Sequence, residues 1–149
     1  MASEDQQSAS AQFSNKWIIN RPGINQKNEI LMVLQGKPEE VKKWSVPSGG
    51  KLPEETYEEC CKREVYEETG FVVEVKQRLF VKNGIVHYFL VEVVGGTMNI
   101  QDPDGLIYDI SWKSLEEIYD LDLCFEEDRD MIIEVLKQNR ESVKGSENQ

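Results

Sequence analysis

The chain has 149 residues, of which 39% are hydrophobic, and these values predict one globular domain with its own hydrophobic core. Its formal net charge of −11 argues against nonspecific binding of nucleic acid, because that affinity comes from lysine and arginine side chains that neutralise phosphates. No run of residues approaches the roughly 20 apolar residues that a membrane-spanning helix needs, so no membrane association is expected.

The two ends of the chain differ in composition from its middle. Residues 1–12 are mostly serine, glutamine, alanine and acidic residues without periodicity, and residues 144–149 are similar. Segments of this kind are often mobile, so residues 13–143 are predicted to form the domain. The N-terminal segment lacks the basic start and the apolar stretch of a secretion signal. The three cysteines show no metal-ligand spacing, and reduced thiols fit the cytoplasm, where we expect the protein.

Short apolar runs separated by turn residues predict a strand-rich α/β domain. The segment Lys82-Asn83-Gly84 has the composition of a tight hairpin turn between two runs rich in Val, Ile, Phe and Tyr. The expected strands cover residues 16–20, which is unusually short, then 30–34, 71–80 and 85–94, and an amphipathic helix is expected over 125–140.

Another helix is predicted before the third strand, because both of its boundary signals are present. Thr56 and Glu59 have the spacing of a capping box, in which each side chain binds the backbone N–H of the other residue. Gly70 supplies the left-handed residue that ends such a helix. Cys60 and Cys61 are expected to pack this helix against the sheet, because free cysteine behaves as a small buried hydrophobe.

Three glutamates of this helix, Glu64, Glu67 and Glu68, fall within an arc of roughly 100° around its axis. Carboxylates crowded in this way repel one another unless a divalent cation lies among them, and Mg²⁺ and Mn²⁺ prefer such hard oxygen ligands. A solvated acidic face is the ordinary alternative for any one of these glutamates, since the chain is rich in acid. A diglycine before the helix and a stop glycine after it favour the metal site.

The segment of residues 49–71 resembles the Nudix box, G-x5-E-x7-R-E-U-x-E-E-x-G-U, in which U is aliphatic or aromatic. In many family members the first spacing starts from the second glycine of a pair, whereas here only the first glycine gives it and the loop is tighter. Every fixed position of the box is filled, by Gly49, Glu55, Arg63, Glu64, Val65, Glu67, Glu68, Gly70 and Phe71.

The resemblance extends over roughly residues 17–138. Trp44–Pro47 matches the W-x-x-P that usually leads into the box, and Asp109–Glu117 matches a late strand that runs into a short helix. The implied fold is an α/β/α sandwich with a mixed β-sheet. The box helix would cover one face of this sheet and the C-terminal helix the other.

The resemblance also implies a function, the metal-dependent hydrolysis of a diphosphate linkage. The cations would polarise phosphoryl oxygens and lower the pKa of the attacking water. Arg63 would hold acidic side chains of the box in place, with Glu55 as its partner, so both are assigned mainly to the surroundings of the ligands. The ligands for Mg²⁺ or Mn²⁺ would be the backbone carbonyl of Gly49 and the side chains of Glu64, Glu67 and Glu68.

Family enzymes often use one more acid from outside the box, as a further ligand or a general base. Asp109 is the expected residue, because it takes the Glu position of the family's E-x-x-W pattern. Asp102, Asp104 and Glu92 remain alternatives, and an exposed acid at the start of a strand is the ordinary interpretation. Lys51 directly follows the diglycine and could contact a phosphate, although a surface lysine is the commoner outcome.

The substrate is predicted less sharply than the reaction. We expect a nucleoside diphosphate linked to another moiety, such as a nucleoside triphosphate. ADP-ribose, a dinucleoside polyphosphate and a non-catalytic nucleotide-binding module are the alternatives. Tyr88 and the preceding His87 lie near the place where some dinucleoside polyphosphate members carry a tyrosine, so Tyr88 is a weak candidate for substrate contact; in an alternating strand it is more often a core residue. A small-molecule nucleotide is the expected partner, and a homodimer is compatible with the sequence.

Overall fold

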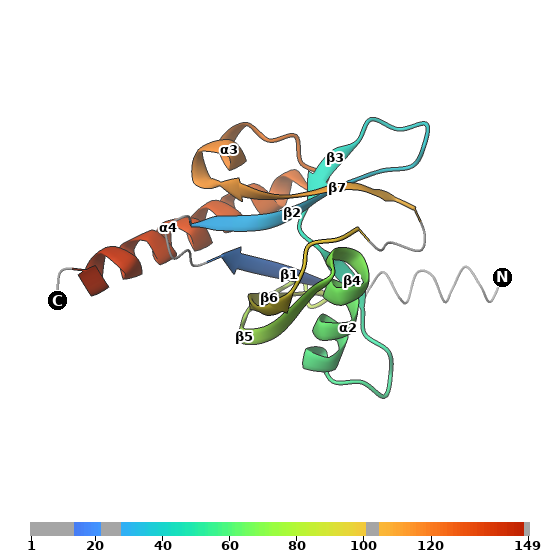
Figure 1. Ribbon diagram of the computed structural model, residues 1–149, viewed down its shortest axis with the longest axis horizontal. Helices are drawn as coiled ribbons and strands as arrows, with labels where there is room; N and C mark the ends of the chain where they lie inside the picture. The colour runs from blue at the N-terminus through green and yellow to red at the C-terminus, as the bar shows by residue number, and fades with distance from the viewer. Residues whose placement is uncertain (1–13, 22–27, 101–104, 148–149) are drawn as a thin grey trace.

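The computed structural model describes residues 14–21, 28–100 and 105–147. Within these ranges the chain forms a seven-stranded sheet, and Figure 1 shows α2 on one side of it and α3 and α4 on the other. The predicted N-terminal segment 1–12, Asp102 and Asp104 lie outside the described residues. The strands are β1 (Ser14–Arg21), β2 (Glu29–Gln35), β3 (Lys43–Ser45), β4 (Ser48–Gly50), β5 (Phe71–Lys82), β6 (Val86–Gly96) and β7 (Ile107–Ser114).

The helices follow the predicted order, with one interruption near the C-terminus. A single 3-10 turn separates the predicted start of the last helix from its regular part, and the helix then continues four residues beyond position 143. The helices are α2 (Tyr57–Thr69), α3 (Leu115–Asp120), the 3-10 turn η1 (Glu126–Asp128) and α4 (Arg129–Glu147). No helix in the described part of the chain is both long and apolar enough to cross a membrane.

The sheet is mixed, as predicted. Its main path runs β3-β2-β1-β6-β5, while β4 pairs with β1 and β7 pairs with β2. The pairing of β1 with β6 is parallel and the other pairings are antiparallel. The hairpin between β5 and β6 turns at Asn83 (φ 54°) and Gly84 (φ 69°), and two consecutive residues with positive φ are what a type I′ turn requires.

Strand β1 is longer than the sequence predicted, with eight residues instead of five. It extends because three different strands pair along it: β4 at its start, β6 along most of its length and β2 at its end. Asn15 belongs to this extension and Lys16 directly follows it, and both are buried although they are polar. Strand β1 therefore lies at the centre of the molecule and carries polar groups into it.

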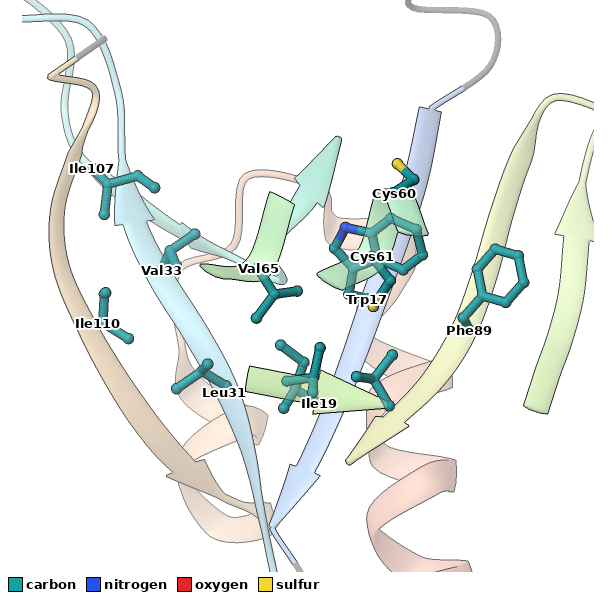
Figure 2. Close-up of a cluster of buried hydrophobic side chains, with 12 residues drawn as sticks. Trp17, Ile19, Leu31, Val33, Cys60, Cys61, Val65, Phe89, Ile107 and Ile110 are labelled. Atoms are coloured by element: carbon teal, nitrogen blue, oxygen red, sulfur yellow. The ribbon is translucent and has the colours of Figure 1, made fainter. Parts of the chain in front are cut away.

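Alternating residues of the central strands supply two separate hydrophobic layers. Trp17 and Ile19 of β1 belong to the layer that includes Cys60, Cys61 and Val65 of α2, and Figure 2 shows this cluster. Ile18 belongs to the second layer, which includes residues of α3 and α4. Both cysteines are fully buried, which confirms the prediction that they pack α2 against the sheet. These two layers confirm the α/β/α arrangement.

Candidate active site

Local sequence signals fix the two ends of α2. The Thr56 hydroxyl accepts a hydrogen bond from the backbone N–H of Glu59 at 3.1 Å, and the Glu59 carboxylate accepts one from the N–H of Thr56 at 2.7 Å. Gly70 ends the helix with φ 83°, and its N–H donates to the carbonyl of Tyr66. The predicted capping box and stop glycine are therefore confirmed. Since Cys60 and Val65 turn toward the sheet, the opposite side of the helix is left for charged residues.

Glu64 lies directly against the backbone of Gly49 in β4. A Cβ atom added at Gly49 would stand 2.4 Å from Cδ of Glu64, closer than any ordinary contact, so glycine is needed for this approach. The carbonyl of Gly49 accepts a hydrogen bond from Nδ2 of the buried Asn15 at 3.2 Å. Together with the pairing of Asn15 and Gly49 in the sheet, this bond orients the carbonyl group.

Arg63 connects the acidic residues of the site. Its Nε and Nη2 donate to the two carboxylate oxygens of Glu55 at 3.1 and 2.6 Å, and its Nη1 donates to Glu64 at 2.9 Å. Nη1 also lies 3.6 Å from a carboxylate oxygen of Glu67. The two-pronged contact with Glu55 has the geometry that favours arginine over lysine. The predicted contact between Arg63 and Glu55 is present.

The surroundings of Glu55 and Glu64 shift the pKa values of these two carboxylates in opposite directions. Hydrogen bonds from Arg63 lower the pKa of Glu55 to about 2. Burial raises the pKa of Glu64 in spite of Arg63, and the charges of Glu67 and Glu55 act in the same direction. Glu64 is thus a carboxylate whose charge is incompletely compensated by the protein, so an added cation would stabilise its ionised form.

The donor set fits a divalent cation, although the side chains would have to adjust. Among the described residues, no three Asp, Glu, His or Cys side chains converge closely enough to hold a metal ion as they now lie. Glu64 and Glu67 nevertheless approach one common positive atom, Nη1 of Arg63. The side chain of Glu67 is 48% exposed and can turn with little loss of packing. Carboxylate oxygens beside the carbonyl of Gly49 are the hard ligands that Mg²⁺ and Mn²⁺ prefer.

Asp109 is not brought to this site. It pairs with Leu34 on β2, while the next residue, Ile110, pairs with Val33 in the layer under α2. Because neighbouring residues of a strand point to opposite faces, Asp109 faces away from α2. It is exposed, and its carboxylate accepts a hydrogen bond from the N–H of Ile110. The sequence spacing to the tryptophan is the family's, but the sheet register directs this acid elsewhere.

The remaining candidates each have other partners in the structure. Glu92 pairs with Lys76 at 3.2 Å. Tyr88 is 1% exposed in the layer under α3 and α4, and its hydroxyl donates to Asp128 at 2.6 Å, so its side chain has no surface to offer a substrate. Lys51 is close to the box helix, where its ammonium group donates to the backbone carbonyls of Leu52 and Glu55.

Two features of this face were missed in the sequence. Asn15, which orients the carbonyl of Gly49, could have been noticed only as a polar residue beside an apolar strand. Tyr57, the first residue of α2, gathers charged and aromatic side chains from β5 and β6, and no local signal indicates this. A hollow elsewhere, beside the start of the β2–β3 connection, includes none of the predicted site residues; it is lined by Gln35, Gly36, Lys37, Glu40, Val41, Lys43, Leu106, Cys124 and Phe125.

Comparisons with known proteins agree with this geometry. The 8-oxo-dGDP phosphatase NUDT18 of Mus musculus is 32% identical over 94 residues, which cover 60% of this chain. The match covers only 29% of that mouse protein, so the chain spans less than a third of its length.

Solved structures share the fold at low sequence identity. A NUDIX hydrolase from Nitrosomonas europaea has a TM-score of 0.64 and 18% identity, with 89% of this chain and 90% of that chain covered. An ADP-ribose pyrophosphatase from Streptococcus suis has a TM-score of 0.63 and 18% identity, with 84% and 91% covered. A model of the NUDIX domain matches residues 23–135, which include the whole box. The chain therefore belongs to the Nudix hydrolase family.

Proposed function

We propose that the protein is a metal-dependent pyrophosphohydrolase, which cleaves the diphosphate bond of a nucleoside diphosphate linked to another moiety. The observation that carries this proposal is the contact between Glu64 and the backbone of Gly49, where a side chain at position 49 would collide with the carboxylate. This contact places a partly buried carboxylate next to a backbone carbonyl that Asn15 orients. A pairing of this kind would provide two oxygen ligands for a cation.

The residues that would hold Mg²⁺ or Mn²⁺ are Gly49, through its carbonyl, and Glu64, Glu67 and Glu68. When bound, the cation would polarise the phosphoryl oxygens and neutralise charge that develops on them. Arg63 would position the site, because it already contacts both Glu64 and Glu67 and is itself held by Glu55. In a chain of net charge −11, a cation bound here would also reverse the local sign of the field and admit a polyphosphate.

The substrate class that we favour is a nucleoside triphosphate or a related nucleotide. ADP-ribose and dinucleoside polyphosphates remain to be compared with it. Since Tyr88 is buried, it gives no reason to prefer dinucleoside polyphosphates. The name of the mouse relative adds 8-oxo-dGDP to the nucleotides that a test must include.

The test is a panel assay of phosphate release from these nucleotides, with and without Mg²⁺, using two matched variants. Glu67→Gln removes a proposed ligand charge, and we expect it to abolish most of the Mg²⁺-dependent activity without unfolding the protein. Glu58→Gln removes the same charge from an exposed position of the same helix, where Glu58 pairs with Lys62 at 3.7 Å, and should leave activity intact. An inactive wild type, or equal losses in both variants, would contradict the proposal.

A further inference from the structure

A cluster of positive and aromatic side chains surrounds Tyr57, on the same face of the sheet as α2. The ring centroids of Tyr57 and His87 are 5.2 Å apart. The guanidinium carbon of Arg78 lies 5.3 Å from the centroid of the Tyr57 ring, and Nζ of Lys51 lies 5.6 Å from it. We call Lys51, Tyr57, Arg78 and His87 the Tyr57 cluster. It gathers basic side chains from three separate segments in a strongly acidic protein.

Arg78 is positively charged without an acidic partner. Within the part of the chain that the structure describes, no carboxylate lies at ion-pair distance from its guanidinium, and its contacts are the rings of Tyr57 and Phe89. The other arginines whose side chains are described, Arg21, Arg63 and Arg129, each pair with a glutamate. Stacking on two rings holds the guanidinium plane while its N–H donors stay available.

His87 offers a second group without a partner. Its Nδ1 is buried and makes no hydrogen bond with any of the described residues. Burial, reinforced by the nearby charge of Arg78, lowers the pKa of His87, so the ring is neutral at neutral pH. A neutral imidazole beside a free guanidinium can bond an anion without adding further charge repulsion to Arg78.

Sheet register connects this cluster with the glutamate site. Asn15 of β1 pairs with His87 of β6 on one side and with Gly49 of β4 on the other. Adjacent strands lie about 4.8 Å apart, so the backbones of Gly49 and His87 are separated by roughly 10 Å. Asn15 bonds the carbonyl of Gly49 from within this row. His87 of the Tyr57 cluster and Gly49 of the proposed cleavage site thus lie in one row across the same face.

We propose that the Tyr57 cluster is a second anion site, which binds the distal phosphoryl groups of a nucleoside polyphosphate. Arg78 donates to a phosphoryl group through its fork, Lys51 contributes a point charge, and His87 contributes a hydrogen bond. The ligand class is a chain of three or more phosphoryl groups, because the backbones of Gly49 and His87 lie two strand spacings, roughly 10 Å, apart. The placement of the chain rests on the proposed function, whereas anion binding by the cluster does not.

Arg21 provides a control for the simpler role of an arginine that only covers an aromatic ring. Its guanidinium carbon lies 5.3 Å from the centroid of the Trp112 ring, and it pairs with Glu29 at 3.6 Å. Arg21→Ala and Arg78→Ala therefore remove the same charge and the same type of stacking contact. Only Arg78→Ala removes a guanidinium without an acidic partner.

The direct test is calorimetric titration of the metal-free full-length protein with inorganic tripolyphosphate and with orthophosphate. We expect Arg78→Ala to weaken tripolyphosphate binding about 10- to 100-fold, as the loss of charged hydrogen bonds implies, with Arg21→Ala close to wild type. Arg78→Lys should recover part of the loss, because it restores the charge without the fork. Melting temperatures of the variants establish that each one is folded. Equal binding by Arg78→Ala and Arg21→Ala would overturn the proposal.

A kinetic test separates this proposal from the proposed function. In Arg78→Ala the KM for nucleoside triphosphates and tetraphosphates should rise, while the KM for a nucleoside diphosphate sugar stays unchanged. A wild type that binds tripolyphosphate through Arg78 but hydrolyses no nucleotide would refute the proposed function and support the anion site. An active wild type whose tripolyphosphate binding and KM values do not depend on Arg78 would refute the anion site alone.

Discussion

Gly49→Ala tests whether the approach of Glu64 to the backbone of β4 is required for activity. The added methyl group would lie 2.4 Å from Cδ, 2.5 Å from Cγ and 2.7 Å from Oε2 of Glu64. Ordinary contacts begin at 3.4 Å, so the Glu64 side chain has to move by about 1 Å. The atoms that the methyl group would meet all belong to the flexible side chain of Glu64. Gly49 does not have a positive φ, so the fold should tolerate alanine at this position.

The expected result is a loss of activity that is large compared with the loss of stability. Turning one side chain from its preferred rotamer costs about 1 kcal/mol, which sets the scale of the change in unfolding free energy. A catalytic group misplaced by about 1 Å can lower the rate roughly 100-fold. The assays are urea unfolding and Mg²⁺-dependent hydrolysis of the substrate that the nucleotide panel identifies.

Gly50→Ala is the matched control for this change. A Cβ atom at Gly50 meets nothing within 4 Å, so this variant should keep both stability and activity. The reasoning is refuted if Gly49→Ala is as active as Gly50→Ala. It is also refuted if Gly49→Ala loses activity only because the protein has unfolded.

Three further outcomes are expected. Mg²⁺ should raise the melting temperature by an amount that grows with the logarithm of its concentration, because it binds the native state; a melting temperature that does not respond would argue against the site. The pKa of Glu55 is lowered to about 2 from 4.5, so its stabilising contact with Arg63 is complete above pH 4.5 and is lost as the pH falls toward 2. The difference in urea stability between wild type and Glu55→Gln should therefore narrow from pH 5 to pH 3, and a constant difference would contradict this linkage. Asp109→Asn should keep near wild-type turnover, since the sheet register turns Asp109 away from α2, and a loss as large as that of Glu67→Gln would show that this acid reaches the site.

The parts of the site that the sequence predicted are those that depend on neighbours along the chain. Thr56, Glu59 and Gly70 form the helix ends through residues at most a few positions apart, so their roles could be predicted without knowledge of the fold. The contact of Arg63 with Glu55 spans eight residues and follows from the spacing of the box. Local geometry determines these contacts, whatever the rest of the chain does.

The parts that the sequence did not predict depend on strand pairing. Asp109 has the expected distance from Trp112 along the chain, but pairing with Leu34 decides which face it occupies. Tyr88 similarly alternates with His87, and the sheet directs Tyr88 to the core and His87 to the face of α2. A one-residue shift in register would exchange these faces, and no short sequence pattern reports that shift.

The charge distribution suggests which property of a substrate this face distinguishes. The chain has 28 acidic and 17 basic residues, so a polyphosphate is repelled until local positive charge attracts it. Two such places are proposed on the same face of the sheet: the glutamate site with a bound cation, and the Tyr57 cluster, whose His87 lies in one row with Gly49. A ligand gains from both only if its phosphate chain reaches from one to the other. We therefore expect KM to fall steeply along a series with one nucleobase and two, three and four phosphates, and to vary less among triphosphates that differ in their base. If KM instead varied more with the base than with the number of phosphates, contacts with the nucleobase, away from the Tyr57 cluster, would select the substrate.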